Sequence, residues 1–208
     1  KFEEKDLLDS GLFYLSDDNQ FLDTFFGRVV FPLTNDKGQV IAFSGRIWQE
    51  TDNQTAKYKN SRSTAIFNKS YELYHLDKAK KGTGKITELY LMEGFMDVIA
   101  AYRAGIENAV ASMGTALSKE HVDHLKRFTK KIVLSYDGDK AGQTATAKAL
   151  EELKEFSVEV VRVPDAMDPD EYLQKNSAED LAYLLTKTRI SPIEFYIHQL
   201  KPENSDNL

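Results

Sequence analysis

Short apolar runs alternate with longer amphipathic segments in the second half of the chain. Runs rich in β-branched and aliphatic residues predict strands at 86–92, 108–112, 131–136 and 158–163. Helical spacing of apolar positions predicts intervening helices at 95–104, 118–128 and 141–156. Strands that alternate with helices of this length form βαβ units, which predicts an α/β fold with a parallel sheet. After Pro169 the pattern predicts only helices, near 178–187 and 190–200.

The first part of the chain has a different rhythm. The spacing of apolar residues over 1–15 is roughly helical, although Gly11 weakens that prediction. Two apolar runs, 29–33 and 40–43, flank the turn sequence 35–38 (Asn-Asp-Lys-Gly), and this arrangement predicts a β-hairpin.

Polar residues follow the predicted hairpin. The stretch 49–64 predicts a loop, and 72–80 has the pattern of a short helix. The glycines of 80–85 then predict a linker into the α/β segment.

Composition narrows the class of protein. With 208 residues, of which 41% are hydrophobic and 29% charged, the chain is predicted to be globular rather than disordered or fibrous. The absence of cysteine excludes a disulfide scaffold, a cysteine nucleophile and thiolate sites for zinc or iron–sulfur clusters. No apolar run approaches the ~20 residues that cross a membrane. No signal-peptide pattern follows Lys1, so we expect a cytoplasmic chain that is a piece of a longer protein.

Charge is distributed unevenly. The net charge of −6 argues weakly against a nucleic-acid-binding protein, but the first 85 residues have a net charge of +1 and the remainder −7. Between Asp52 and Glu72 lie four cations and no acid, namely Lys57, Lys59, Arg62 and Lys69. Such a strip is typical of a surface that contacts phosphates, and a solvated loop is the alternative.

Acidic side chains follow three of the four predicted strands. They are Glu93 and Asp97 after the first strand, Asp137 and Asp139 after the third, and Asp168 and Asp170 after the fourth. The carboxyl ends of parallel strands share one edge of a sheet, so we expect the six carboxylates to converge there. Because like charges held together are costly, and because hard oxygen ligands suit Mg²⁺ or Mn²⁺, we expect more than one such ion. A pair of these ions activates a 3′ hydroxyl and stabilises a phosphoryl leaving group.

Each acidic motif taken alone has an ordinary structural explanation. An Asp-Gly-Asp sequence is commonly a surface turn, and Asp168 or Asp170 could be the N-cap of a helix. Against this, small residues at Gly94, Gly138 and Gly142 would let the backbone approach a phosphate closely. The recurrence of acids after three strands favours the functional interpretation.

For several aromatic and histidine residues we expect a structural rather than a chemical role. Trp48, at a strand end, is expected to pack rather than to stack on a base, and Phe25-Phe26 is expected in the core. His121 and His124 lie one helical turn apart without a third ligand in view, so surface or partner contacts are expected for them.

The acidic motifs carry a family likeness. The sequence resembles the Toprim domain at Glu93-Gly94-Phe95-Met96-Asp97, at Ser135-Tyr136-Asp137-Gly138-Asp139-Lys140-Ala141-Gly142 and at Asp168-Pro169-Asp170. It also resembles the part that precedes Toprim in bacterial replicative primases of the DnaG type, at Arg28-Val29-Val30-Phe31-Pro32-Leu33, Gly45-Arg46, Lys57-Tyr58-Lys59-Asn60-Ser61 and Phe67-Asn68-Lys69. This resemblance implies an α+β amino-terminal subdomain at 1–84, a Rossmann-like Toprim domain at 85–167 and a helical subdomain at 168–208.

The resemblance also implies roles for individual residues. The catalytic acids would be Glu93, Asp137 and Asp139. The metal ligands would be Glu93, Asp97, Asp137, Asp139, Asp168 and Asp170. The residues that hold template or nucleotide would be Arg28, Arg46, Lys57, Tyr58, Asn60, Ser61 and Lys69.

The implied activity is DNA-directed RNA polymerisation. Such an enzyme joins nucleoside triphosphates into short RNA primers on a single-stranded DNA template, with Mg²⁺ or Mn²⁺, in the cytoplasm at the replication fork and without a membrane. A zinc-binding domain and a domain that contacts the replicative helicase are expected outside this sequence, and guanosine polyphosphates, (p)ppGpp, are expected inhibitors. The alternatives are a nuclease or topoisomerase with Toprim chemistry, and a non-catalytic Toprim scaffold that binds nucleic acid.

Overall fold

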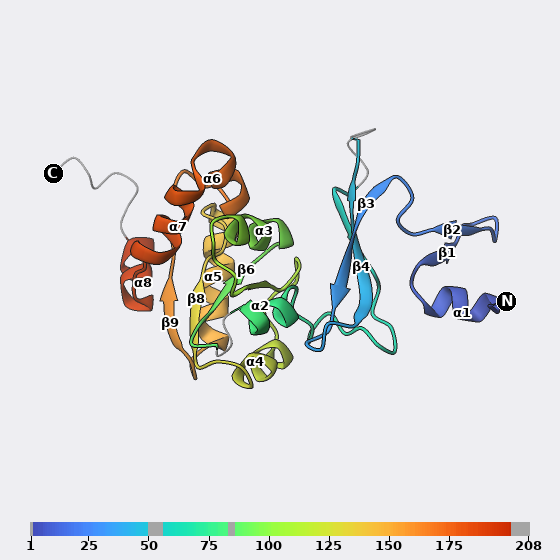
Figure 1. The fold of residues 1–208 in the computed structure, drawn as a ribbon, viewed down its shortest axis with the longest axis horizontal. Helices are drawn as coiled ribbons and strands as arrows, with labels where there is room; N and C mark the ends of the chain where they lie inside the picture. Colours follow the sequence, from blue (N-terminus) through green and yellow to red (C-terminus); the bar gives the residue numbers. More distant parts are fainter. Residues whose placement is uncertain (1, 50–55, 83–85, 201–208) are drawn as a thin grey trace. The chain divides into compact units, whose positions relative to one another are not determined.

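A computed structural model describes residues 2–49, 56–82 and 86–200 (Figure 1). The chain divides into two compact units, Lys1–Glu72 and Leu73–Leu208. No helix among the described residues is both long and apolar enough to cross a membrane.

A three-stranded antiparallel sheet forms the centre of the first unit. Strands β3 (Arg28–Thr34) and β4 (Val40–Ile47) make the predicted hairpin, which is thereby confirmed, and β5 (Tyr58–Asn60) adds to the free edge of β4. At the hairpin turn the Asn35 side chain accepts hydrogen bonds from the backbone N–H groups of Lys37 and Gln39, both at 3.0 Å. These bonds are typical of an Asn-initiated turn.

Two expectations for this unit are wrong in part. Helix α1 covers only Glu4–Asp9, because Gly11 takes a positive φ of 71° and turns the chain toward a small hairpin. That hairpin pairs β1 (Phe13–Leu15) with β2 (Phe21–Asp23). The predicted loop 49–64 contains strand β5, which forms because the backbone of 58–60 pairs with β4; residues 50–55 of that loop lie outside the described part.

A four-stranded parallel sheet with the order β7-β6-β8-β9 forms the second unit and confirms the predicted α/β fold. Its strands are β6 (Leu89–Met92), β7 (Ala109–Ala111), β8 (Lys131–Leu134) and β9 (Ser157–Val160). The helices are α2 (Leu76–Gly82), α3 (Phe95–Arg103), α4 (Lys119–Lys126), α5 (Lys140–Glu152), α6 (Pro169–Lys175), α7 (Ala178–Lys187) and α8 (Pro192–Leu200). Residues 83–85 of the expected linker lie outside the described part.

Side chains alternate along each strand and belong to two hydrophobic layers, one on each face of the sheet. Leu89 and Leu91 of β6 pack with apolar residues of α2, α4, α5 and α8, whereas Tyr90 and Met92 pack with those of α3, α6 and α7. All four residues of β6 are buried, as expected for a strand covered by helices on both faces. The sheet is therefore the middle layer of an α/β/α sandwich.

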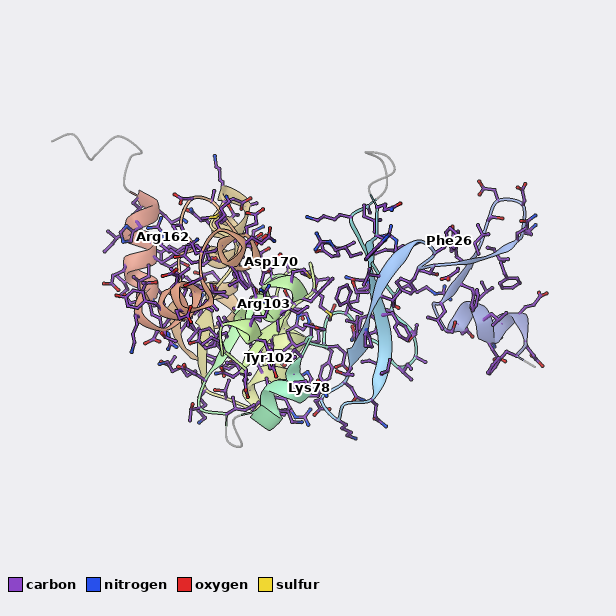
Figure 2. The ribbon with its side chains drawn as sticks, turned by 45° about the horizontal axis from the view of Figure 1, so that its top comes forward. Phe26, Lys78, Tyr102, Arg103, Arg162 and Asp170 are labelled. Carbon is purple, nitrogen blue, oxygen red and sulfur yellow. The ribbon has the colours of Figure 1, made fainter. Side chains whose placement is uncertain are left out.

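Among the expectations for Phe25, Phe26, His121 and His124, only the one for Phe25 is confirmed. Phe25 is buried as expected, but Phe26 is exposed and extends from the loop that follows β2 (Figure 2). His121 and His124 are both buried rather than on the surface. The His121 ring accepts from the Ser118 backbone at the start of α4, and His124 packs edge-on against Phe128 at 5.4 Å, so both stabilise the helix that carries them.

Candidate functional site

The order of the strands places two acids beside each other at one edge of the parallel sheet. From β6 the chain passes to β7 on one side, and then to β8 on the other side of β6. Ligands bind α/β sheets at such a switch point, outside the carboxyl ends of the strands. Glu93 directly follows β6 and Asp137 follows β8, and the backbone N–H of Asp137 donates to Oε1 of Glu93 at 3.4 Å.

Asp97 lies one turn into α3 and connects two segments of the site. Its Oδ2 accepts from the backbone N–H of Gly94 at 3.0 Å, and its Oδ1 accepts from that of Asp170 at 3.4 Å. The side chain is only 5% exposed. A carboxylate this deeply buried would be costly unless a proton or a cation compensates its charge.

Asp139 and Asp168 are both helix N-caps, which the structural interpretation predicts for Asp168 but not for Asp139. Asp139 accepts from the backbone N–H of Gly142 at 2.7 Å, and Asp168 accepts from that of Glu171 at 2.6 Å. Each bond uses one oxygen, Oδ1, of its carboxylate. Capping and a functional role are therefore compatible at both positions, since the second oxygen has capacity for another partner.

Asp170 also lies at the start of α6 (Figure 2), where its Oδ2 accepts from the Gln174 side chain at 3.0 Å. Sequence reasoning missed Glu171, the next residue, although it extends the same acidic run. The negative charge of Glu171 contributes to raising the pKa of Asp137.

The electrostatics of the cluster favour protonated carboxyl groups. Burial, followed by the charges of Asp168 and Asp137, raises the pKa of Asp97 to about 8. Burial and then the charge of Glu93 raise the pKa of Asp137 to about 7. Burial also raises the pKa of Glu93, and the hydrogen bond from Asp137 opposes that shift. These acids raise one another's pKa because they lie close together. The negative charge predicted from the sequence is therefore concentrated at this edge of the sheet.

Two glycines allow the chain to pass tightly through the site. A Cβ on Gly138 would lie 2.2 Å from the carbonyl oxygen of Val163, and one on Gly142 would lie 2.3 Å from that of Asp137. The Gly138 N–H also donates to the Met167 carbonyl at 2.8 Å. Only glycine fits these approaches, which hold the segment after β8 against the segment that leads to Asp168.

The acids supply the donor chemistry of a hard divalent cation but do not yet form a closed coordination shell. All six are carboxylates, the class of ligand that Mg²⁺ and Mn²⁺ prefer. Over the described residues no group of three acidic or histidine side chains lies at the spacing of a metal site. The donor set therefore fits such an ion in its chemistry.

A cavity of about 530 Å³ opens beside Glu93. One wall is the loop from Ser112 to Leu117, and the other is a face of α5 that combines alanines such as Ala145 with the charged residues Lys148, Glu151 and Glu152. The loop is tightly turned, with positive φ at Met113 and Gly114. This space can hold a small organic group next to the acidic cluster.

The predicted cationic residues all belong to the first unit, and the structure divides them by role. Arg46 and Lys57 lie over the ring of Tyr58, with the guanidinium carbon at 5.6 Å and the ammonium nitrogen at 5.9 Å from the ring centre. Such cation–π contacts align the side chains while leaving their donors available. Lys57 is exposed, whereas Lys69 is only partly exposed.

Arg28, Ser61 and Asn60 are engaged within the sheet instead. The Arg28 guanidinium donates to three backbone carbonyl oxygens, those of Gly45 and Ala56 at 3.0 Å and that of Lys57 at 3.4 Å. Ser61 is buried and accepts from the Phe43 N–H at 3.0 Å. The Asn60 side chain accepts from the Ser44 hydroxyl at 2.5 Å. Each of the three holds strands of the sheet together.

Two family models match the chain. One, described as "Toprim-like", covers residues 90–173, and the other, "DNA primase catalytic core, N-terminal domain", covers residues 1–80. The second match covers the first compact unit, and the first covers the central part of the second unit.

Curated relatives are named DNA primase. That of Lactococcus lactis subsp. lactis is 54% identical over 208 residues, which is 100% of this chain and 32% of the relative. That of Listeria monocytogenes is 43% identical over 199 residues, covering 94% of this chain and 32% of the relative. The chain therefore spans about a third of the length of these relatives.

Solved structures are similar over nearly the whole chain. A DNA primase domain from Pseudomonas aeruginosa has a TM-score of 0.84 and 35% identity, with 94% of this chain and 62% of that one covered. A DnaG primase catalytic domain bound to ssDNA has a TM-score of 0.82 and 34% identity, covering 95% and 62%. The RNA polymerase domain of Mycobacterium tuberculosis DnaG in complex with double-stranded DNA has a TM-score of 0.82 and 32% identity, covering 95% and 64%.

Proposed function

Since the chain belongs to the bacterial DNA primase family and corresponds to part of its catalytic core, we propose that it carries the site at which RNA primers are made on single-stranded DNA. The observation that carries this proposal is the meeting of Glu93 and Asp137 at the switch point of the parallel sheet, with Asp97 and Asp168 beside them. Primer synthesis belongs to chromosome replication, so the cytoplasm is the expected compartment.

The acidic cluster is the proposed metal site. Asp137, Asp139 and Glu93 would be the principal ligands, and Asp97, Asp168 and Asp170 would complete it around Mg²⁺ or Mn²⁺, with more than one ion. When bound, these ions favour attack of a 3′ hydroxyl on an α-phosphate with release of pyrophosphate. The raised pKa values support the proposal, because a site that is costly to ionise in isolation gains from a cation.

The acidic side chains of the second unit would position the reacting groups. Asp97 stays fixed through two backbone hydrogen bonds, and Asp139 and Asp168 stay fixed as N-caps. Because their carboxylates are held by backbone rather than by mobile side chains, little ordering is needed when substrate arrives. The cavity beside Glu93 is the proposed space for the nucleoside of a bound nucleotide.

The first unit is the proposed surface for phosphates. Arg46 and Lys57 keep their cationic groups beside Tyr58, and Lys69 adds a third cation. Template, RNA primer and nucleoside triphosphates share this chemistry, and (p)ppGpp would compete for the same donors. Arg28, Asn60 and Ser61 would support that surface from within, as their hydrogen bonds indicate. A replicative helicase would bind a part of the longer protein outside this sequence.

Primer synthesis by the full-length protein and by this chain tests the proposal. Single-stranded DNA, labelled ribonucleotides and Mn²⁺ or Mg²⁺ should give RNA oligomers that are lost in Glu93→Gln and Asp137→Asn. Asp123→Asn removes a carboxylate that is mostly exposed on α4 and should leave synthesis unchanged. Cleavage of the DNA without ribonucleotides would favour the nuclease alternative, and template binding with neither activity would favour the scaffold.

A further inference from the structure

Trp48 is the only tryptophan of the sequence, and it is exposed. It directly follows β4, and 72% of its surface is open to solvent. The sequence predicts that Trp48 packs against the protein, and this prediction is wrong. An indole offers a large flat apolar face with little entropy to lose, so an exposed one is well suited to a stacking contact.

The backbone places Trp48 on the same face of the sheet as Arg46. The N–H of Trp48 donates to the Gly27 carbonyl at 3.2 Å, which continues the β3–β4 ladder past the end of β4. Side chains alternate between the faces of a sheet, so the ladder continued to residue 48 assigns Trp48 to the face of Arg46, where the chain begins to bend. Arg46 is paired with Tyr58 on β5, so Trp48 is a diagonal neighbour of that tyrosine on the same face.

Two cations lie against the Tyr58 ring. The guanidinium of Arg46 and the ammonium group of Lys57 lie on the Tyr58 ring. This face therefore combines flat aromatic surface with positive charge at the spacing of neighbouring strands. Single-stranded nucleic acid has the complementary pattern, because its bases expose π-faces and its phosphates follow each base. A duplex lacks that pattern, since its bases are already stacked inside it.

We infer that Trp48 stacks on an unpaired base of a single-stranded nucleic acid whose phosphates are held by Arg46 and Lys57. The inference rests on the proposed function and deepens it, because it adds a base-contacting residue to the surface on which Arg46 and Lys57 are proposed to hold phosphates. Tyr58 carries the neighbouring base position on the same face.

Tryptophan fluorescence tests this directly, because Trp48 is the sole indole. Titration of the 208-residue chain with a 12-nucleotide oligo(dT) should quench the emission as binding saturates. A 12-unit abasic strand, which keeps the phosphates, should bind without quenching. Trp48→Ala should weaken oligo(dT) binding, measured by anisotropy of a labelled strand, by about 5- to 150-fold. The dependence of its affinity on salt should not change, since no phosphate contact is lost.

Two further variants separate stacking from a general structural effect. Trp48→Phe should restore most of the affinity, because it retains a ring. Tyr183→Ala removes an exposed aromatic side chain of the second unit and should bind as the wild type does. Unchanged unfolding temperatures establish that the variants are folded.

The outcomes distinguish this inference from the proposed function. Oligo(dT) binding without quenching, or with equal affinity in Trp48→Ala, would overturn the inference and leave Trp48 as a contact for another protein. Primer synthesis could still occur in that case, and the proposed function would stand. Quenching of the 208-residue chain by oligo(dT), together with no primer synthesis by the full-length protein, would support the inference and refute the proposed function.

Discussion

The backbone N–H of Asp170 donates to Oδ1 of Asp97, 73 residues earlier in the chain. This bond joins the first turn of α3 to the first turn of α6, so it fixes one acidic segment against another. The Asp97 carboxylate is thereby held at the sheet edge by two backbone groups, Gly94 and Asp170, rather than by solvent.

Asp97 makes stability depend on pH when divalent cations are absent. Its pKa is about 8 in the folded chain and near 3.8 when unfolded. The folded state therefore binds the proton more tightly, and its contribution to stability is present below the unfolded pKa and is lost as pH rises through about 8. In EDTA, the unfolding temperature should fall between pH 5.5 and 8.5. Asp97→Asn should flatten that fall, and an equal fall in both proteins would contradict the assignment.

Divalent cations should stabilise the second unit through the same cluster. Mn²⁺ at 100 times its Kd should add about 2.7 kcal/mol to the free energy of unfolding, which corresponds to roughly 5–10 °C in a chain of this size. Glu93→Gln and Asp137→Asn should lose most of that increase because each removes a negative ligand. Thermal unfolding with and without Mn²⁺ measures it, and Asp123→Asn is the matched control. An increase of the same size in all four proteins would place the ion elsewhere.

The cations of the first unit should separate into two classes. Lys57→Ala should weaken binding of single-stranded DNA and reduce the slope of log Kd against log salt by about 0.7, because one phosphate contact is lost. Lys37→Ala, in the exposed hairpin turn, should leave the slope unchanged. Arg28→Ala should instead lower the free energy of unfolding by about 2 kcal/mol, because its guanidinium holds three carbonyls. A salt slope altered in Arg28→Ala at unchanged stability would reverse that assignment.

Arg189 should be the main electrostatic support at the opposite edge of the sheet. It donates to Glu88 at 2.8 and 3.0 Å and to Glu159 at 3.0 Å, and Lys131 pairs with both glutamates at 3.1 Å. Arg189→Ala should cost roughly 2–3 kcal/mol of stability, measured by urea unfolding at pH 7.

Acid should narrow the difference in stability between Arg189→Ala and the wild type, and the remainder comes from the bonds of Arg189 to the Leu185 carbonyl and the Tyr90 hydroxyl. The pKa values of Glu88 and Glu159 are lowered through their hydrogen bonds to Arg189, against the opposing effect of burial. Their contribution is therefore present above the unfolded pKa and is lost as pH falls through the folded value. The exposed Arg162 (Figure 2) provides the control, and Arg162→Ala should match the wild type at every pH.

The convergence of acids could be predicted from the sequence because two regularities suffice for it. Apolar runs identify the parallel strands, and the carboxyl ends of such strands share an edge, so Glu93 and Asp137 must lie near each other. The burial of Asp97 could not be predicted, because it depends on α6 packing against α3. Strand β5 was missed because three residues, Tyr-Lys-Asn, have no apolar alternation and become a strand only by pairing with β4.

The direction in which a side chain points could not be predicted from the sequence either. Arg28 and Lys57 are both cations near the same strands, yet one points into backbone carbonyls and the other into solvent. Whether Trp48 packs or protrudes likewise depends on where the ladder of β4 ends, which no local pattern encodes. The residue types predicted the kind of chemistry at the site. The course of the backbone determines which side chains are available for it.

The two edges of the parallel sheet differ in how their negative charge is balanced. At the amino edge, Glu88 and Glu159 are neutralised by Arg189 and Lys131 from the chain itself. At the carboxyl edge, among the residues placed in the structure, Glu93, Asp97, Asp137 and Asp168 form no ion pair with lysine or arginine. The negative charge of this edge is therefore open to compensation by protons or by bound cations. The charge state of this edge thus depends on the pH and on the ions of the surrounding solution.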